Sequence, residues 1–217
     1  MTYSVKEMFY TLQGEGFHTG RPAVFCRFTG CNLWSGREQD RAQSVCQFCD
    51  TDFVGTDGQN GGKFKQPADL AQAIATQWPS GRGHRFVVFT GGEPALQLDD
   101  RLIAELHRLD FVCAVETNGT LALPDAVDWV CISPKGVAQV ALTRCNELKL
   151  VYPQVDAPPE RFTELQADYR YLSPINDYRE QTIVPARNHA TQACIDYCLS
   201  HPEWHLTLQA HKIVNID

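Results

Sequence analysis

Two periods of apolar residues run along this 217-residue chain. Short runs that are apolar almost throughout and are bounded by Gly, Pro, Asn or Ser are typical of buried β-strands. The predicted strands are 4–11, 22–29, 85–90, 111–116, 129–133, 147–151, 169–172 and 204–209. A Gly-rich turn, Leu12-Gln13-Gly14-Glu15-Gly16, follows the first of them. The first two strands are therefore predicted to flank this turn.

Three other segments have the helical period. The first helix begins near Pro67, because proline suits the first turn, and its apolar stripe includes Leu70 and Ile74. The second follows Asp99, a favourable N-cap, and Leu98 and Ile103 occupy the two positions of a hydrophobic staple. The third covers 190–199.

Near-continuous apolar strands separated by helices favour a parallel sheet covered by helices. About six core strands and three helices are too few for a closed eightfold barrel. The sequence therefore predicts an α/β fold, a partial, open parallel β/α barrel with few helices. We expect one domain over 1–217, with an N-terminal extension and first core strand (1–29), a long loop (30–66), and a C-terminal strand and tail (204–217).

Polar residues follow four of the predicted strands where each strand ends. The clusters are Thr90-Gly91-Gly92-Glu93, Glu116-Thr117-Asn118-Gly119, Ser133-Pro134-Lys135 and Ser173-Pro174-Ile175-Asn176-Asp177. One such cluster is ordinary loop polarity. Parallel α/β folds bind ligands outside the carboxyl ends of their strands, so four clusters together predict a continuous binding rim.

The long loop carries Cys31, Cys46 and Cys49, spaced C-x14-C-x2-C. Three thiolates can hold three irons of a four-iron cluster, which leaves the fourth iron open to a ligand that is not protein. A structural zinc site is the alternative, with Cys26 or His18 as the fourth ligand. We expect five other cysteines to be small hydrophobic residues of the core, namely Cys26, Cys113, Cys131, Cys194 and Cys198.

The charge and composition of the chain limit the classes of partner that it can bind. The net charge is −7 and no basic stripe is present, which argues against direct binding to nucleic acid and favours a small molecule. No apolar run approaches the roughly 20 residues that cross a bilayer, and the N-terminus lacks a secretory signal. We expect a cytoplasmic protein that does not bind membranes.

Taken together, the cysteine spacing and the rim motifs resemble the radical S-adenosylmethionine superfamily. The turn 12–16 and the C-terminal Gln209-Ala210-His211-Lys212 resemble its 7-carboxy-7-deazaguanine synthase family, and the likeness spans nearly the whole chain. One departure is the cysteine loop, which has fourteen residues where the superfamily pattern has three between the first two cysteines. Closing the longer loop costs only about 1.4 kcal/mol more, so it does not prevent cluster binding.

The resemblance implies a [4Fe-4S] cluster on the three cysteines, S-adenosylmethionine on its open iron, and Mg²⁺ on the Thr51 hydroxyl. It assigns to S-adenosylmethionine Phe48, Asp50, Gly92, Glu116, Ser133, Pro134, Lys135, Ser173, Pro174, Ile175 and Asn176. The residues predicted to bind substrate are Leu12, Gln13, Gly14, Glu15, Arg27, Thr90, His211 and Asp217. No side chain is assigned as catalytic, because the adenosyl radical does the chemistry.

Some of these residues have plainer explanations. An Arg27 fork suits a planar carboxylate, but Arg27 also fits a surface charge on a strand. Glu116 and Lys135 could instead pair with each other, and Thr51 could be a turn residue after Asp50.

The implied reaction is the ring contraction of 6-carboxy-5,6,7,8-tetrahydropterin to 7-carboxy-7-deazaguanine with release of ammonia. This is a carbon–nitrogen lyase step in queuosine and 7-deazapurine biosynthesis. A flavodoxin- or ferredoxin-type electron donor and a homodimer are implied as well. The alternatives are another radical S-adenosylmethionine enzyme, such as an activase of a glycyl-radical enzyme, and a non-catalytic zinc-stabilised binding module.

Overall fold

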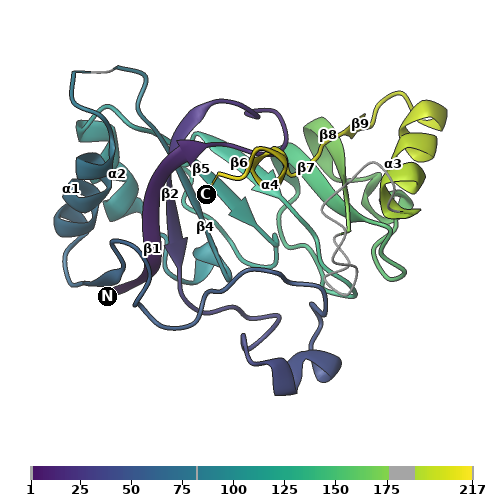
Figure 1. Ribbon diagram of the computed structural model, residues 1–217, viewed down its shortest axis with the longest axis horizontal. Helices are drawn as coiled ribbons and strands as arrows, with labels where there is room; N and C mark the ends of the chain where they lie inside the picture. Colours follow the sequence, from purple (N-terminus) through teal and green to yellow (C-terminus); the bar gives the residue numbers. More distant parts are fainter. Residues whose placement is uncertain (1, 82, 176–188, 217) are drawn as a thin grey trace.

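The computed structural model describes residues 2–81, 83–175 and 189–216 (Figure 1). The strands are β1 Tyr3–Leu12, β2 Pro22–Phe28, β3 Gly62–Phe64, β4 Phe86–Gly91, β5 Val112–Thr117, β6 Trp129–Ile132, β7 Arg144–Tyr152, β8 Gln166–Pro174 and β9 His205–Leu206. The α-helices are α1 Pro67–Gln77, α2 Asp100–Arg108, α3 His189–Ser200 and α4 Ala210–Val214, and short 3₁₀ helices are η1 Glu38–Gln43, η2 Pro94–Leu96 and η3 Pro159–Phe162.

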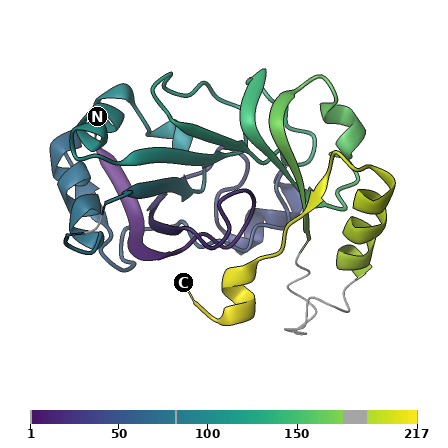
Figure 2. The same cartoon turned by 90° about the horizontal axis from the view of Figure 1, so that it is seen from above.

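Within the described residues the strands form one sheet in the order β3-β1-β2-β4-β5-β6-β7-β8-β9. Every neighbouring pair from β2 to β9 is parallel, whereas β1 is antiparallel to both β2 and β3. Figure 2 shows the sheet curving, with α1, α2 and α3 on its outer side and its two edges apart. The predicted open parallel β/α barrel with few helices is confirmed.

Two apolar clusters hold the helices to this sheet. The larger lies between α1, α2 and the strands β1 to β5, and the smaller joins β7 and β8 to α3. The predicted helix signals are present: Leu70 and Ile74 are fully buried, and Asp99 Oδ1 accepts a hydrogen bond of 3.0 Å from the Leu102 N–H. Leu98 and Ile103, the predicted staple, are buried as well.

Apart from shifts of one to three residues at the ends of elements, two segments differ from the sequence prediction. The last strand is only His205–Leu206 rather than 204–209, because the chain leaves the sheet there and the Ala210 N–H bonds to the Gly14 carbonyl at 2.9 Å. This contact starts α4, which has no counterpart in the prediction. The segment 30–66, predicted as one long loop, contains η1 and β3, and β3 pairs with β1.

No helix in the described part of the chain has the length and apolar character needed to span a membrane.

Candidate active site

Two adjoining cavities open at the carboxyl ends of the parallel strands. The first, here the cysteine cavity, has a volume of about 200 Å³ and contains the ends of β4, β5 and β8 together with the loop that carries Cys31, Cys46 and Cys49. The second, here the hairpin cavity, lies against the β1–β2 turn and includes Arg27. Residues that line both cavities are Glu15, Asp50, Thr51, Thr90, Glu116 and Gln209. A ligand in either cavity is thus adjacent to a ligand in the other.

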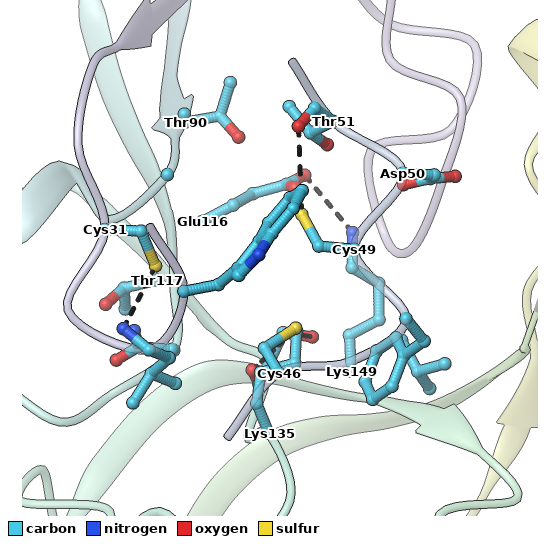
Figure 3. Close-up of a pocket in the computed structure, with 18 of the residues that line it drawn as sticks. Cys31, Cys46, Cys49, Asp50, Thr51, Thr90, Glu116, Thr117, Lys135 and Lys149 are labelled. Atoms are coloured by element: carbon cyan, nitrogen blue, oxygen red, sulfur yellow. Dashed lines mark hydrogen bonds and ion pairs between the residues drawn. The ribbon is translucent and has the colours of Figure 1, made fainter. Parts of the chain in front are cut away.

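The three predicted cluster ligands come together. Figure 3 shows Cys31, Cys46 and Cys49 entering the same space. A hydrogen bond between the thiols of Cys46 and Cys49 raises the pKa of Cys46 and lowers that of Cys49. Burial raises the pKa of Cys31. Behind the cysteines, Trp34 and Phe53 pack edge to face and form a small apolar cluster with Cys46. This donor set fits a cluster with three thiolate ligands, because the metal takes the place of the thiol protons.

The proposed fourth zinc ligands do not belong to this group. Cys26 is fully buried in the large apolar cluster, and the His18 ring packs against Phe86 and Trp129. Neither residue lines the cysteine cavity. Within the described part of the chain, neither of the two fourth ligands that the zinc alternative named therefore lies with the three cysteines.

The Gly-Gly-Glu-Pro segment after β4 packs tightly against the cysteine loop. A Cβ atom on Gly92 would lie 2.1 Å from the Gly30 carbonyl oxygen and 2.8 Å from Cys31 Cβ, so only glycine fits. The next residue, Glu93, is fully buried and accepts hydrogen bonds from Thr117 Oγ1 (2.6 Å), Asn118 N (2.7 Å) and Ala95 N (2.9 Å). Glu93 thus joins the end of β4 to the end of β5.

Most residues predicted for S-adenosylmethionine line the cysteine cavity: Phe48, Asp50, Gly92, Glu116, Ser133, Lys135, Ser173 and Pro174. Pro134 and Ile175 are neighbours of lining residues in the chain but do not line the cavity themselves. Asn176 lies outside the described residues. Lys135 donates hydrogen bonds of 2.6 Å to the carbonyl and the hydroxyl of Ser133, rather than pairing with Glu116.

The hairpin cavity collects the residues predicted for substrate: Leu12, Gln13, Gly14, Glu15, Arg27, Thr90 and His211. Arg27 lies on β2 and its Nε pairs with Glu7 at 2.8 Å inside the cavity, so it is more than a surface charge. His211 of α4 closes one side, since a Cβ on Gly14 would come within 2.0 Å of its Nδ1. Burial lowers the pKa of His211, which keeps the ring neutral. Asp217 lies outside the described residues.

Sequence reasoning missed Lys149, whose ammonium group lies beside the residues that line both cavities. Its side chain is 5% exposed, and its Nζ lies 2.8 Å from Glu15 Oε2 and 3.3 Å from Glu116 Oε1 (Figure 3). A signal was present, because Glu147 and Lys149 alternate with Leu148 and Leu150 in an otherwise apolar strand. Trp34, Phe53 and Gln209 also line the cysteine cavity and were not predicted.

Comparison with known proteins places the whole chain beside one set of relatives. No family model matches it. A Caulobacter vibrioides protein named 7-carboxy-7-deazaguanine synthase is 58% identical over 216 residues, and one of the same name from Escherichia coli K12 is 32% identical over 238 residues; both alignments cover all of each chain. The crystal structure of QueE from Escherichia coli superposes with a TM-score of 0.71 at 30% identity, covering 97% of this chain and 95% of that one.

Proposed function

This chain belongs to the 7-carboxy-7-deazaguanine synthase family of radical S-adenosylmethionine enzymes, and from that premise we propose how its two cavities divide the reaction. The chain converts 6-carboxy-5,6,7,8-tetrahydropterin to 7-carboxy-7-deazaguanine and ammonia, a carbon–nitrogen lyase step of queuosine biosynthesis. The observation that carries the division is the shared wall: a cavity with three cysteines and a cavity with an arginine have Glu15, Thr51, Thr90 and Glu116 in common.

The cysteine cavity holds the cofactors. Cys31, Cys46 and Cys49 ligate three irons of the cluster, and the backbone at Gly92, together with Ser133 and Lys135, surrounds S-adenosylmethionine. When bound, the reduced cluster and S-adenosylmethionine supply the radical that starts the rearrangement. The protein's own work here is to orient the two and to exclude water with the apolar layer of Trp34 and Phe53.

The hairpin cavity holds the pterin. The Arg27 fork suits the substrate carboxylate, and the ionised Glu15 accepts hydrogen bonds from the ring N–H and the exocyclic amine. Thr51 lies at the shared wall, where its hydroxyl and the substrate carboxylate can share Mg²⁺; Mg²⁺ takes few protein ligands and suits such a site. The Glu7 carboxylate must then share Arg27 with the substrate.

Two further parts of this proposal have the resemblance alone as support. A flavodoxin- or ferredoxin-type protein supplies the electron, and the chain acts as a homodimer. The activase and zinc-module alternatives are not favoured, because the full-length relatives carry the synthase name and a second cavity that includes Arg27 and Glu15 adjoins the cysteine cavity.

The test is anaerobic incubation of the cluster-loaded protein with the pterin, S-adenosylmethionine, Mg²⁺ and a reductant. We expect 7-carboxy-7-deazaguanine and ammonia in equal amounts. Cleavage of S-adenosylmethionine without any deazapurine would overturn the substrate while leaving the cofactor assignment in place. A colourless protein with bound zinc and no iron would overturn both.

A further inference from the structure

Lys149 pairs with two carboxylates of the wall that the two cavities share. It lies on β7 and points to the concave side of the sheet, where its Nζ reaches Glu15 from the β1–β2 turn and Glu116 from β5. The two carboxylates have one further donor each: Ser173 Oγ bonds to Glu15 at 3.0 Å and Gln13 Nε2 to Glu116 at 2.9 Å. Three strands of the sheet (β5, β7 and β8) and its first turn therefore converge on one ammonium group.

The charges of this cluster depend on Lys149. Burial by itself raises the pKa of Glu15, but the attraction and hydrogen bond of Lys149 outweigh it and lower that pKa. Burial acts in the opposite sense on Lys149, yet Glu116 and Glu15 raise its pKa well above the ordinary value. Without the cation, the burial that raises the pKa of Glu15 is no longer outweighed, and its carboxyl group keeps a proton to higher pH.

The other titratable groups around the cluster do not replace this cation. Glu147 is on the same strand, but it is a carboxyl group and cannot supply a positive charge; burial raises its pKa. The Cys131 thiol of β6 is buried, and burial raises its pKa. His211 of α4 faces Glu15, but burial lowers its pKa and keeps it neutral. Among the described residues, the ion pairs of Glu15 and Glu116 are both with Lys149.

We propose that Lys149 is a positioning residue that holds the Glu15 carboxylate at the wall shared by the two cavities and keeps it ionised. Glu15 then presents only acceptor atoms to the hairpin cavity. A neutral Glu15 would offer a donor where the ligand ring also has one. Lys149 thereby selects ligands that carry N–H donors at this edge. This inference rests on the proposed function for the identity of the ring.

Lys149→Met tests the idea, since methionine fills similar space without charge. We expect equilibrium binding of the pterin to the cluster-loaded protein to weaken about 10- to 100-fold at neutral pH, the loss typical of a hydrogen bond to a charged group. The loss should shrink as pH rises, because the proton leaves the Glu15 carboxyl group. In the wild type the affinity should be nearly constant over that range. KM should rise more than kcat falls.

The matched control is Lys149→Arg, which keeps the charge and should keep the pH-independent binding even if the larger group lowers affinity. A Lys149→Met protein that binds the pterin like wild type, or that loses the same factor at every pH, overturns the proposal. If Lys149→Met does not fold, the proposal is tested by the infrared difference spectrum between wild type and the Glu15→Gln variant. Loss of a carboxylate band supports the proposal, and loss of a carboxylic-acid band overturns it.

Failure of the proposed function has a different signature. A wild-type protein that binds no pterin and forms no deazapurine would contradict the substrate assignment. The infrared measurement on Glu15 would still report whether that carboxyl group, paired with Lys149, is ionised.

Discussion

On β7, Leu148 and Leu150 lie in the apolar cluster that includes Cys194 of α3, whereas Glu147 and Lys149 face into the barrel. All four are nearly inaccessible to solvent: the leucines are 0% exposed and the two charged residues 4% exposed. Burial therefore does not distinguish the two faces. The outer face stabilises the fold through apolar area, at roughly 25 cal/mol per Å². The inner face gains little net stability, since pairing only offsets the desolvation of its charges.

The largest expected effect comes from removing a cysteine on the inner side of the sheet. It should abolish cluster content and activity without changing the stability of the metal-free protein. Cys49→Ala removes one of three thiolates, and the two that remain cannot hold a four-iron cluster. We expect iron and sulfide content to collapse and product to fall below detection, while the unfolding midpoint of the metal-free protein stays close to wild type. Cys198→Ala is the matched control, because Cys198 of α3 is a partly buried thiol beside the outer cluster. Equal iron loss in both variants would contradict the assignment of the loop cysteines.

The outer side should respond in the opposite way. Leu148→Ala leaves a cavity in the cluster between β7 and α3 and should lower the free energy of unfolding by about 2–5 kcal/mol in urea titrations. Turnover per cluster-loaded, folded molecule should remain near wild type, because the leucine points away from both cavities. If turnover per loaded molecule drops along with stability, the two faces are coupled more tightly than the packing indicates.

Glu93 should have an effect between those of Cys49 and Leu148. It is buried, and it joins the end of β4 to the end of β5. Burial raises its pKa, and three hydrogen bonds favour the charged form and partly offset this. Glu93→Gln replaces one acceptor with a donor facing either Thr117 or Asn118, so we expect a loss of about 1.5–3 kcal/mol in unfolding free energy. Calorimetry of the metal-free protein measures this. An unchanged midpoint would mean that the end of β4 is fixed by something other than this carboxylate.

The sequence predicted the outer face more completely than the inner one. Apolar periods found α1, α2, α3 and the core strands, because each pattern is local and its partner can be any apolar surface. The five-residue α4 was missed, since its position depends on a bond between Ala210 and Gly14, almost two hundred residues apart. The antiparallel position of β1 between β3 and β2 also depends on pairing rather than on any local signal.

The same reasoning explains which site residues were found. Motifs at strand ends gave the rim, because parallel strands bring their carboxyl ends together whatever their order. Lys149 lies inside a strand, and its role exists only through Glu15 and Glu116 on other elements. Trp34 was missed for a similar reason, as it becomes a wall residue only through Phe53 and the Arg41 guanidinium stacked 4.1 Å from its ring.

The smallest expected effect concerns a charge on the outer side, at the N-terminus of α2. Burial would raise the pKa of Asp99, but the hydrogen bonds from Tyr3 and from the Leu102 N–H outweigh it and lower that pKa. A lowered pKa in the folded state gives stability that is present above the unfolded value of about 3.9 and is lost as pH falls through the folded value. Asp99→Asn keeps the cap but removes the charge.

We therefore expect Asp99→Asn to cost about 0.3–1 kcal/mol of unfolding free energy at neutral pH, and we expect the difference from wild type to vanish at acid pH. Urea titrations of the metal-free proteins at several pH values measure this. Lys149→Met is the comparison from the inner face: its binding defect should shrink towards alkaline pH, whereas the stability defect of Asp99→Asn should shrink towards acid. A common pH trend in the two variants would show that the charges on the two faces do not act separately.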